Sequence, residues 1–189
     1  MMIRNGLQIV ECWGHLEISE NQNQDKPDLE IHFFEPSGEN FATAEEIFEW
    51  FQPGIILNEC WISDSAWIKK LYKPKISTQS SQYRSFLNKW ENEEDCRFIR
   101  LDEYISENRI DEIDLIKMDI EWAEFGVLLD IEDHIFKKIK SIFLEYHILD
   151  ESYEISFTQL LTKLKKLYIY IEITESEHDS RIGYISAFN

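Results

Sequence analysis

Apolar runs bounded by polar turns recur along the chain, and their lengths are those of β-strands. Most of these runs are followed by polar segments in which apolar residues return at helical spacing. The pattern therefore predicts strands that alternate with helices. The predicted strands cover residues 7–12, 30–36, 54–62, 97–101, 113–118, 141–147, 167–174 and 181–188, with a short extended piece at 69–75.

Four helices are predicted between these strands. Ser37 is placed to cap the first, and Asp102 is placed to start the second. The third begins near Ala123, and the fourth covers residues 156–166. Residues 76–95 are rich in Ser, Gln and charge, which fits either a cover over an active site or a solvated loop and helix.

The last two predicted strands are separated by six polar residues, which indicates an antiparallel hairpin. Alternating strands and helices closed by a hairpin predict an α/β three-layer sandwich with a mostly parallel sheet. The chain has 189 residues, 43% of them apolar, which is enough for one sizeable core. No linker or repeat divides it, so a single domain over residues 1–189 is expected.

The charge balance narrows the range of partners. The net charge is −18, from 37 acidic and 19 basic residues, and binding to nucleic acid or an anionic membrane requires basic residues instead. Cys12, Cys60 and Cys96 are odd in number and include no C-x-x-C pair, so we expect neither a disulfide framework nor a zinc site, and no metal-binding residues are assigned. These features, and the lack of a signal-peptide run or membrane span, predict a reducing, cytoplasmic location.

The stretch IDLIKMDIEWAEFGVLL, residues 113–129, carries the densest candidate chemistry. Its apolar strand ends in three acids, Asp119, Glu121 and Glu124, where the strand leads into a helix. Ligands bind at this edge of an open α/β sheet. Glu121 and Glu124 could instead merely complement the helix dipole. Asp119 closes a strand, so its charge is expected to lie in the crevice unless it finds a partner.

Other predicted strands also end in polar residues. Glu11, Glu35 and Asp64 close the first three strands, and together with Asp119 they predict one acidic crevice. An acid at the tip of a second strand is suited to accept hydrogen bonds from a ribose diol, although Glu35 could also be a surface acid before a turn. His147 shares a strand face with Glu145, and the alternative for His147 is a structural histidine.

Five stretches give the chain a resemblance to the FkbM-like methyltransferases. They occur in the order of that family and span most of residues 30–147. The resemblance implies S-adenosylmethionine as methyl donor, a seven-stranded Rossmann-like sheet and a final hairpin similar to that of the family. The five stretches are IHFFEPSGENF at 31–41, ILNECWISD at 56–64, IRLDEYI at 99–105, DLIKMDIEWAEFGVL at 114–128 and SIFLEYH at 141–147.

The resemblance also implies roles for individual residues. Glu35 would hold the cofactor ribose, Asp64 would lie near the adenine, and Glu11 would stand for the Asp of the first glycine-rich turn. Asp119 and Glu121 would face the methyl group and the acceptor, with Glu145 and His147 completing the acceptor side. The expected cofactor-binding residues are thus Glu11, Gly14, Glu35, Pro36, Asp64 and Asp119, and the expected catalytic residues are Asp119, Glu121 and His147.

The chain departs from the family at two glycine turns. Trp13 and Glu17 stand where the first turn has glycines, which let the backbone approach the cofactor, and Trp122 replaces the glycine of the Asp-x-Glu-Gly turn. We predict an O-methyltransferase acting on a hydroxyl of a sugar or other small molecule. The alternative is a degenerate, non-catalytic domain that binds a ligand or protein partner. A nicotinamide-dependent oxidoreductase is less well supported, because no G-x-G-x-x-G follows the first strand.

Overall fold

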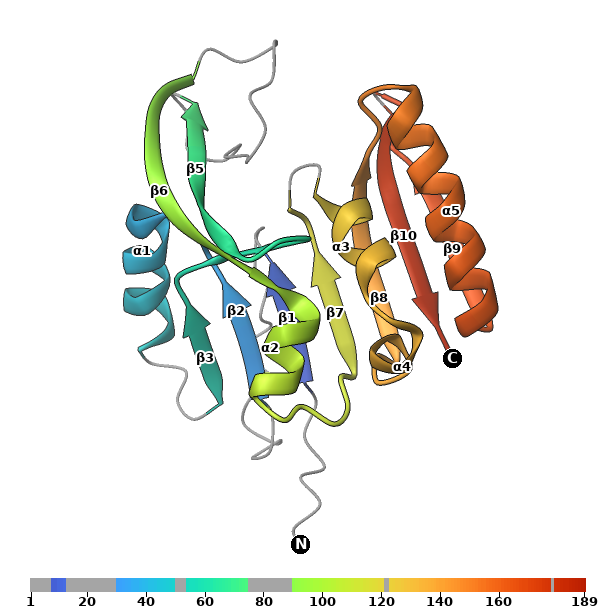
Figure 1. The fold of residues 1–189 in the computed structure, drawn as a ribbon, viewed down its shortest axis with the longest axis horizontal. Coiled ribbons are helices and arrows are strands. Elements are labelled where there is room, and N and C mark those ends of the chain that lie inside the picture. The colour runs from blue at the N-terminus through green and yellow to red at the C-terminus, as the bar shows by residue number, and fades with distance from the viewer. Residues whose placement is uncertain (1–7, 13–29, 50–53, 75–89, 121–122, 178) are drawn as a thin grey trace, which may run out of the picture.

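A seven-stranded sheet forms the centre of the protein (Figure 1). The computed structural model describes residues 8–12, 30–49, 54–74, 90–120, 123–177 and 179–189. The strand order across the sheet is β3-β2-β1-β7-β8-β10-β9. These strands are β3 (Ile55–Asn58), β2 (Glu30–Phe34), β1 (Gln8–Cys12), β7 (Leu115–Met118), β8 (Ser141–His147), β10 (Ile182–Phe188) and β9 (Tyr170–Glu175).

The sheet is mixed. β3, β2, β1, β7 and β8 pair in parallel, whereas β10 is antiparallel to both of its neighbours, β8 and β9. The predicted α/β class and the closing hairpin are therefore confirmed. The predicted strand at residues 141–147 coincides with β8, because its alternating buried and half-buried residues are bounded by polar residues at both ends.

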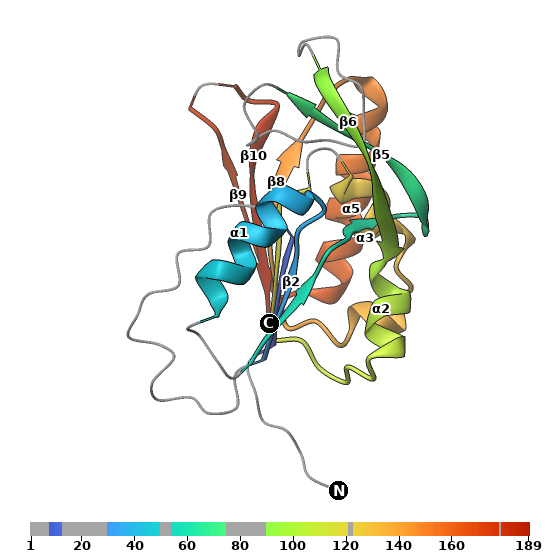
Figure 2. The same cartoon turned by 90° about the vertical axis from the view of Figure 1, so that its left-hand side faces the viewer.

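Helices lie on both faces of the sheet (Figure 2). α1 (Gly38–Phe48) packs Ala44 and Phe48 against Phe33 on one face. The opposite face is covered by α2 (Leu101–Glu107), α3 (Glu124–Asp130), α4 (Asp133–Phe136) and α5 (Glu151–Leu167). Among the described residues, no helix has the length and apolar character needed to cross a membrane.

The helix ends differ from those expected. Ser37 stands at the N-cap position of α1, but its side chain makes no capping hydrogen bond. α5 starts at Glu151, five residues before the predicted start at Ser156. The carboxylate of Asp150 accepts hydrogen bonds from the backbone N–H groups of Ser152 and Tyr153, so this N-cap sets the start of the helix.

A second, three-stranded sheet was not predicted. Its order is β4-β6-β5, with β4 (Trp61–Ser63) parallel and β5 (Trp67–Pro74) antiparallel to β6 (Trp90–Arg100). The single strand predicted at residues 54–62 is wrong, because the chain leaves the main sheet after Asn58 and re-enters extended structure at Trp61. Residues 90–95 of the predicted loop or cover belong to β6.

One continuous core joins the two sheets. Trp61 and Phe98 of the small sheet stack with ring centroids 6.1 Å apart. Both belong to the same buried cluster as Phe34 of β2, Ile116 of β7 and Leu144 of β8. The small sheet is thus fixed to the body of the protein by buried apolar side chains, and it stands above the carboxyl ends of the parallel strands (Figure 1).

Gly183 of β10 occupies a position that has no room for a side chain. A Cβ atom there would lie 2.4 Å from the carbonyl oxygen of Thr174 and 2.6 Å from the hydroxyl of Tyr146. We expect Gly183→Ala to lower the free energy of unfolding by about 2 kcal/mol, because the backbone of a paired strand must move. Urea denaturation measures this loss. Ser186→Ala on the same strand should change it by less than about 0.5 kcal/mol, and equal losses in the two variants would contradict the prediction.

Candidate functional site

The order of the strands defines where a crevice can form. β1 lies in the middle of the parallel strands, with β2 on one side and β7 on the other. The chain turns from β1 toward β2 and β3 and later returns to β7, so the order of strands reverses between β1 and β7. In open α/β sheets, ligands bind outside the carboxyl ends of the strands at such a switch point.

The register places the predicted acids at this edge. Phe34, Cys12 and Met118 are paired across β2, β1 and β7, and Met118 is paired with Leu144 of β8. The next residues along these strands include Glu35, Asp119 and Glu145. Since neighbouring strands are about 4.8 Å apart, Glu35 and Asp119 stand about 10 Å apart with the end of β1 between them.

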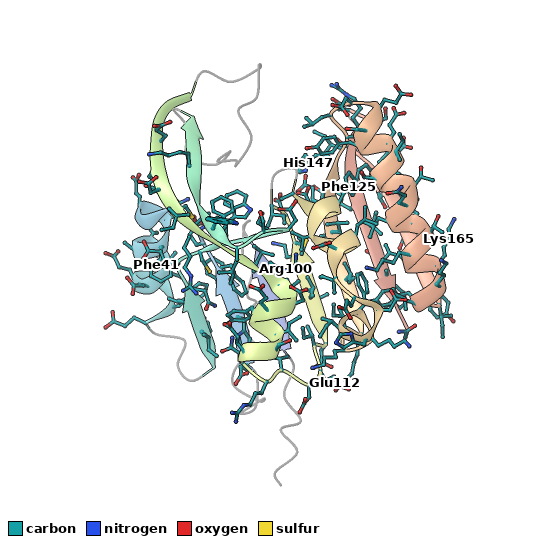
Figure 3. The ribbon with its side chains drawn as sticks, in the orientation of Figure 1. Phe41, Arg100, Glu112, Phe125, His147 and Lys165 are labelled. Atoms are coloured by element: carbon teal, nitrogen blue, oxygen red, sulfur yellow. The ribbon has the colours of Figure 1, made fainter. Side chains whose placement is uncertain are left out.

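Asp119, Glu124 and His147 are brought together at the end of β7. One ligand-type atom from each of these side chains lies within 4.8 Å of those of the other two. Asp119 is half-buried, Glu124 has no exposed surface, and His147 is 8% exposed. His147 is labelled in Figure 3, where it lies at the upper end of β8 near Phe125 of α3. The structure thus joins two of the three predicted catalytic residues.

Glu124 is held in place by the turn between β7 and α3. Its Oε1 accepts a hydrogen bond of 3.1 Å from the backbone N–H of Ile120 and lies 3.4 Å from Nδ1 of His147. Because Glu124 is the first residue of α3, its charge also faces the positive end of the helix. The sequence placed Glu124 among the acids at the end of the strand, with the helix dipole as the alternative explanation, but it gave no sign of the contact with His147.

Tyr184 of β10 extends this acidic region. It is paired with Glu145 across β8 and β10, and its ring stacks on Phe143 with centroids 5.6 Å apart. The negative charge of Glu145, burial and the charge of Asp119 raise the pKa of the Tyr184 hydroxyl. Tyr184 was not predicted as a site residue, because its position is set by the antiparallel register of the hairpin.

Glu35 follows β2 and is buried, with 3% of its surface exposed. Its Oε1 accepts a hydrogen bond of 2.8 Å from the backbone N–H of Ser37 at the start of α1. Glu94 of β6 accepts a hydrogen bond of 3.2 Å from the next N–H, that of Gly38. The N-terminus of α1 is therefore occupied by two carboxylates. Pro36 is buried between β2 and α1, next to Glu35.

Asp64 does not close the third strand of the main sheet. That strand, β3, ends at Asn58, and Asp64 follows β4 in the small sheet. Asp64 packs against α3, where its Oδ2 would lie only 3.2 Å from a Cβ atom on Gly126. Ser63 and Ser65 donate hydrogen bonds to its Oδ1. The strand assignment of Asp64 was wrong, whereas its role beside adenine stays a prediction.

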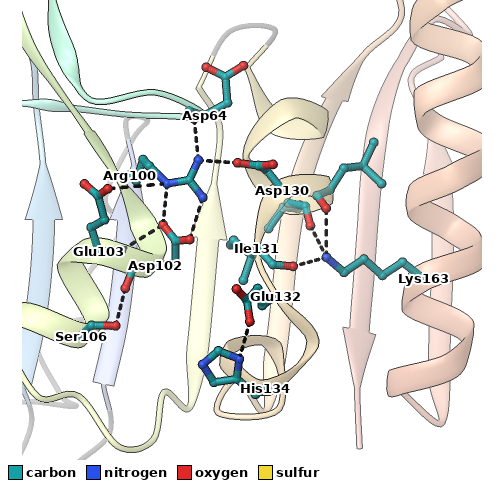
Figure 4. A network of polar contacts seen from close by, with 12 residues as sticks. Asp64, Arg100, Asp102, Glu103, Ser106, Asp130, Ile131, Glu132, His134 and Lys163 are labelled. Atoms are coloured by element: carbon teal, nitrogen blue, oxygen red, sulfur yellow. Dashed lines mark hydrogen bonds and ion pairs between the residues drawn. The ribbon is translucent and has the colours of Figure 1, made fainter.

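Arg100, at the end of β6, connects three segments around this site (Figure 4). Its guanidinium donates two hydrogen bonds to Asp102, of 3.0 and 2.7 Å, and one of 2.8 Å to the backbone carbonyl of Asp64. A further hydrogen bond reaches Asp130 at the end of α3. Burial alone would raise the pKa of Asp102, but the hydrogen bonds and charge of Arg100, together with hydrogen bonds from the backbone N–H groups of Glu103 and of Asp102 itself, hold that pKa below its usual value.

Lys163 of α5 stabilises the other end of α3. Its ammonium group donates hydrogen bonds to the backbone carbonyls of Leu128, Leu129 and Ile131 (Figure 4). These carbonyls belong to the last turn of the helix and the residue after it, which lack helical partners. Burial lowers the pKa of Lys163. α3, which carries Glu124, is therefore fixed at its carboxyl end by α5.

A buried polar network connects β2, β3 and α2. Nδ1 of His32 lies 2.7 Å from the hydroxyl of Tyr104, which donates a hydrogen bond of 3.2 Å to Asn58. Nε2 of His32 lies 3.1 Å from the carboxylate of Glu30. These residues come from β2, β3 and α2, so the network fixes α2 against the sheet. The alternation of β2 alone gave no signal for it, because its partners are distant in sequence.

The two buried thiols are not nucleophiles at neutral pH. Burial raises the pKa of Cys60 to about 11 and that of Cys96 to about 12. A thiol attacks as the thiolate, which these environments disfavour. Covalent catalysis by either residue is therefore not supported.

Several predicted site residues fall outside what the structure describes. Glu11 belongs to β1, whose backbone is described but whose side chains are not. Gly14, Glu121 and the two tryptophans at glycine positions, Trp13 and Trp122, lie outside the described residues. Their roles stay predictions.

The described residues fit the cofactor that the family resemblance implies. A nucleoside needs acceptors for its ribose hydroxyls, and the carboxylate of Glu35, which directly follows β2, is an acceptor group at this edge of the sheet. A sulfonium is cationic, and Asp119, Glu124 and Glu145 supply negative charge beside it. Glu35 and Asp119 would thus face the ribose and the neighbouring sulfonium of the cofactor from the two sides of β1.

Comparison with known proteins gives weak individual likenesses. The chain is 17% identical to a crystal structure of methyltransferase FkbM from Methylobacillus flagellatus, with a TM-score of 0.48 over 84% of this chain and 36% of that one. The structure of EvdMO1 is 14% identical, with a TM-score of 0.43 over 95% and 36%. The 16S rRNA methylase ArmA is 12% identical, with a TM-score of 0.37 over 97% and 74%.

A sequence relative and a family model complete the comparison. The AMB antimetabolite synthetase AmbE of Pseudomonas aeruginosa is 44% identical over 52 residues, which are 28% of this chain and 2% of that protein. The chain thus spans a small part of this relative and about a third of the first two solved structures. The model of the methyltransferase FkbM domain matches residues 30–177, most of the chain. The chain therefore belongs to the FkbM methyltransferase domain family.

Proposed function

We propose that this chain is an S-adenosylmethionine-dependent O-methyltransferase that acts on a hydroxyl of a small molecule such as a sugar. The observation that carries the proposal is the position of Glu35 and Asp119 on either side of the central strand, at the switch point of the sheet. The mixed sheet with its final hairpin agrees with the Rossmann-like arrangement that the family resemblance implies.

The residues of the chain would share the work as follows. S-adenosylmethionine supplies a methyl group on a positively charged sulfur. Glu35 would accept hydrogen bonds from the ribose, and Asp119 would face the sulfonium. As the acceptor oxygen bonds to the methyl carbon and the bond between that carbon and the sulfur breaks to leave a neutral thioether, the acceptor proton would pass to Asp119 or His147. Holding the reactants in contact is worth up to roughly 7–11 kcal/mol, and a base adds about 10²–10⁴-fold in rate.

The charge of the chain supports a small acceptor. With a net charge of −18, the chain would repel the phosphates of nucleic acid and anionic lipid. The acidic side chains at the edge of the sheet favour the cationic cofactor over its neutral product. Glu121 lies outside the described residues and is kept as a proposed catalytic residue from the family motif.

Calorimetry with S-adenosylmethionine tests the proposal. We expect Glu35→Gln to weaken binding roughly 10- to 150-fold, because a charge-assisted hydrogen bond worth about 1.5–3 kcal/mol is lost. Glu39→Gln is the control, since Glu39 is an exposed acid in the first turn of the same helix and should leave affinity unchanged. Equal effects in the two variants would refute the role of Glu35. A parent chain that binds neither the cofactor nor its demethylated product would favour the non-catalytic alternative.

A further inference from the structure

The three side chains at the end of β7 have the chemistry of a metal site. Asp119 and Glu124 offer carboxylate oxygens, and His147 offers an imidazole nitrogen, all within 4.8 Å of one another. Two ligands bonded to one ion at about 2.0–2.4 Å can be at most about 4.8 Å apart. The observed separations are therefore those that a single bound ion allows. We propose that Asp119, Glu124 and His147 bind a divalent transition-metal ion.

The three ligands come from rigid parts of the fold. Asp119 directly follows β7, Glu124 is the first residue of α3, and His147 is the last residue of β8. β7 and β8 are paired neighbours in the sheet, and α3 is fixed at its far end by Lys163. Sites built on strands and helices hold their geometry better than sites built on loops.

Charge favours a cation at this place. Glu124 is fully buried beside the half-buried Asp119, and two carboxylates at such short range repel each other in a medium of low dielectric constant. Glu145 is a further carboxylate in this region, since both Glu145 and Asp119 act electrostatically on the hydroxyl of Tyr184. A protonated His147 could neutralise one of these charges, whereas a divalent ion neutralises two. The ion would then be the largest local charge in the site.

The ligand set selects among metals. Carboxylates suit Mg²⁺, Ca²⁺ and Mn²⁺, whereas imidazole suits Zn²⁺, Fe²⁺ and Ni²⁺. One imidazole and two carboxylates therefore favour an ion that binds both nitrogen and oxygen ligands. Mn²⁺ meets this requirement, has a direct spectroscopic signal, and is therefore the probe.

The role of the ion rests on the proposed function, although its binding does not. A divalent ion beside the cofactor would hold the oxygen of the acceptor and lower the pKa of its hydroxyl. Asp119 and His147 would then act as ligands, and the acidified proton of the acceptor hydroxyl would pass to solvent water instead of to His147. Metal binding would give the buried Glu124 a role as a ligand. Direct proton transfer from the acceptor to Asp119 gives Glu124 no such role.

Mn²⁺ binding to the full chain tests the site. The chain is treated with a chelator and titrated with Mn²⁺, and free Mn²⁺ is followed by electron paramagnetic resonance. We expect a single tight Mn²⁺ per chain, and we expect His147→Ala to weaken its binding by more than about tenfold, since even the loss of an outer-sphere partner costs about 10- to 100-fold. Asp119→Asn removes the charge of one ligand and keeps the shape of the side chain, and it should weaken Mn²⁺ binding by a similar factor.

His134→Ala is the matched control. Nδ1 of His134 lies 3.0 Å from the carboxylate of Glu132, but both side chains are exposed. If His134→Ala weakened Mn²⁺ binding as much as His147→Ala, the ion would be attracted only by the general negative charge, and the proposal would be overturned. Absence of tight binding in a parent chain with a cooperative thermal transition would also overturn it. Cofactor calorimetry is independent of this titration, so failure of the proposed function can be told apart from failure of the metal site.

Discussion

Replacing Trp61 by alanine is expected to lower the free energy of unfolding by about 3–5 kcal/mol, the largest effect that we predict. Trp61 is 2% exposed and stacks on Phe98 in the core that joins the two sheets. Its removal would leave a cavity between the small sheet and the main body, where rigid strands on both sides limit collapse. Chemical denaturation followed by far-ultraviolet circular dichroism measures the loss.

Trp67→Ala is the control for this prediction. Trp61 and Trp67 both pair with Phe98, from opposite sides of β6, but the side chain of Trp67 is 74% exposed. The two substitutions therefore remove the same group from the same sheet and differ mainly in burial. We expect Trp67→Ala to change stability by less than about 0.5 kcal/mol. Comparable losses in both variants would contradict the prediction, because burial in the joint core would then not explain the effect of Trp61→Ala.

The main sheet could be predicted from the sequence because its strands are short apolar runs with polar ends. Residues 113–118 and 141–147 correspond to β7 and β8, and the six polar residues between 174 and 181 correctly indicated the hairpin. These signals are local. Parts of the small sheet had local signals, since residues 97–101 of the predicted strand overlap β6 and the extended piece at 69–75 overlaps β5. The acid-rich residues ENEED near the start of β6 have no such signal, and only pairing with β5 makes them a strand.

The site could be predicted only where a strand end fixed its position. Asp119 and His147 close the neighbouring strands β7 and β8, and the structure brings their side chains together, whereas their catalytic roles stay predictions. Asp64 was assigned to the wrong strand, because nothing in the sequence between Asn58 and Trp61 showed that the chain changes sheets. Glu124 was expected in the first turn of a helix, but its full burial depends on the packing of α3 against β8, which the sequence alone does not show.

Arg100→Met should lower the free energy of unfolding by about 3 kcal/mol and loosen α3 relative to the small sheet. Methionine keeps most of the length and apolar stem of the side chain but removes every donor. The loss leaves Asp102, Asp130 and the carbonyl of Asp64 without the charged group that bonds them. Hydrogen bonds to a charged group are worth about 1.5–3 kcal/mol each, and partial exposure of Arg100 reduces their sum.

Arg181→Met is a closely matched control for Arg100→Met. Arg181 also forms two hydrogen bonds, of 3.0 and 2.7 Å, with an aspartate two residues away, Asp179. That pair lies at an exposed hairpin and connects no second segment, so its loss should scarcely change stability. An equal loss in the two variants would show that the pairing with aspartate matters and the bridging of segments does not.

Acid titration separates the charge of Arg100 from its packing. The pKa of Asp102 is lowered in the folded state, so its ion pair with Arg100 stabilises the fold above the unfolded pKa of about 4 and loses that effect as pH falls through the folded value. The parent chain should therefore lose more stability than Arg100→Met between about pH 4 and pH 2. If the difference between the two chains stayed constant over this range, packing of the arginine stem would explain the loss. If the difference in the free energy of unfolding between the parent chain and Arg100→Met shrank as the pH fell, the charge of Arg100 would be what joins α2, α3 and the small sheet beside Asp64. The adenine side of the proposed cofactor site would then depend on Arg100 for its shape.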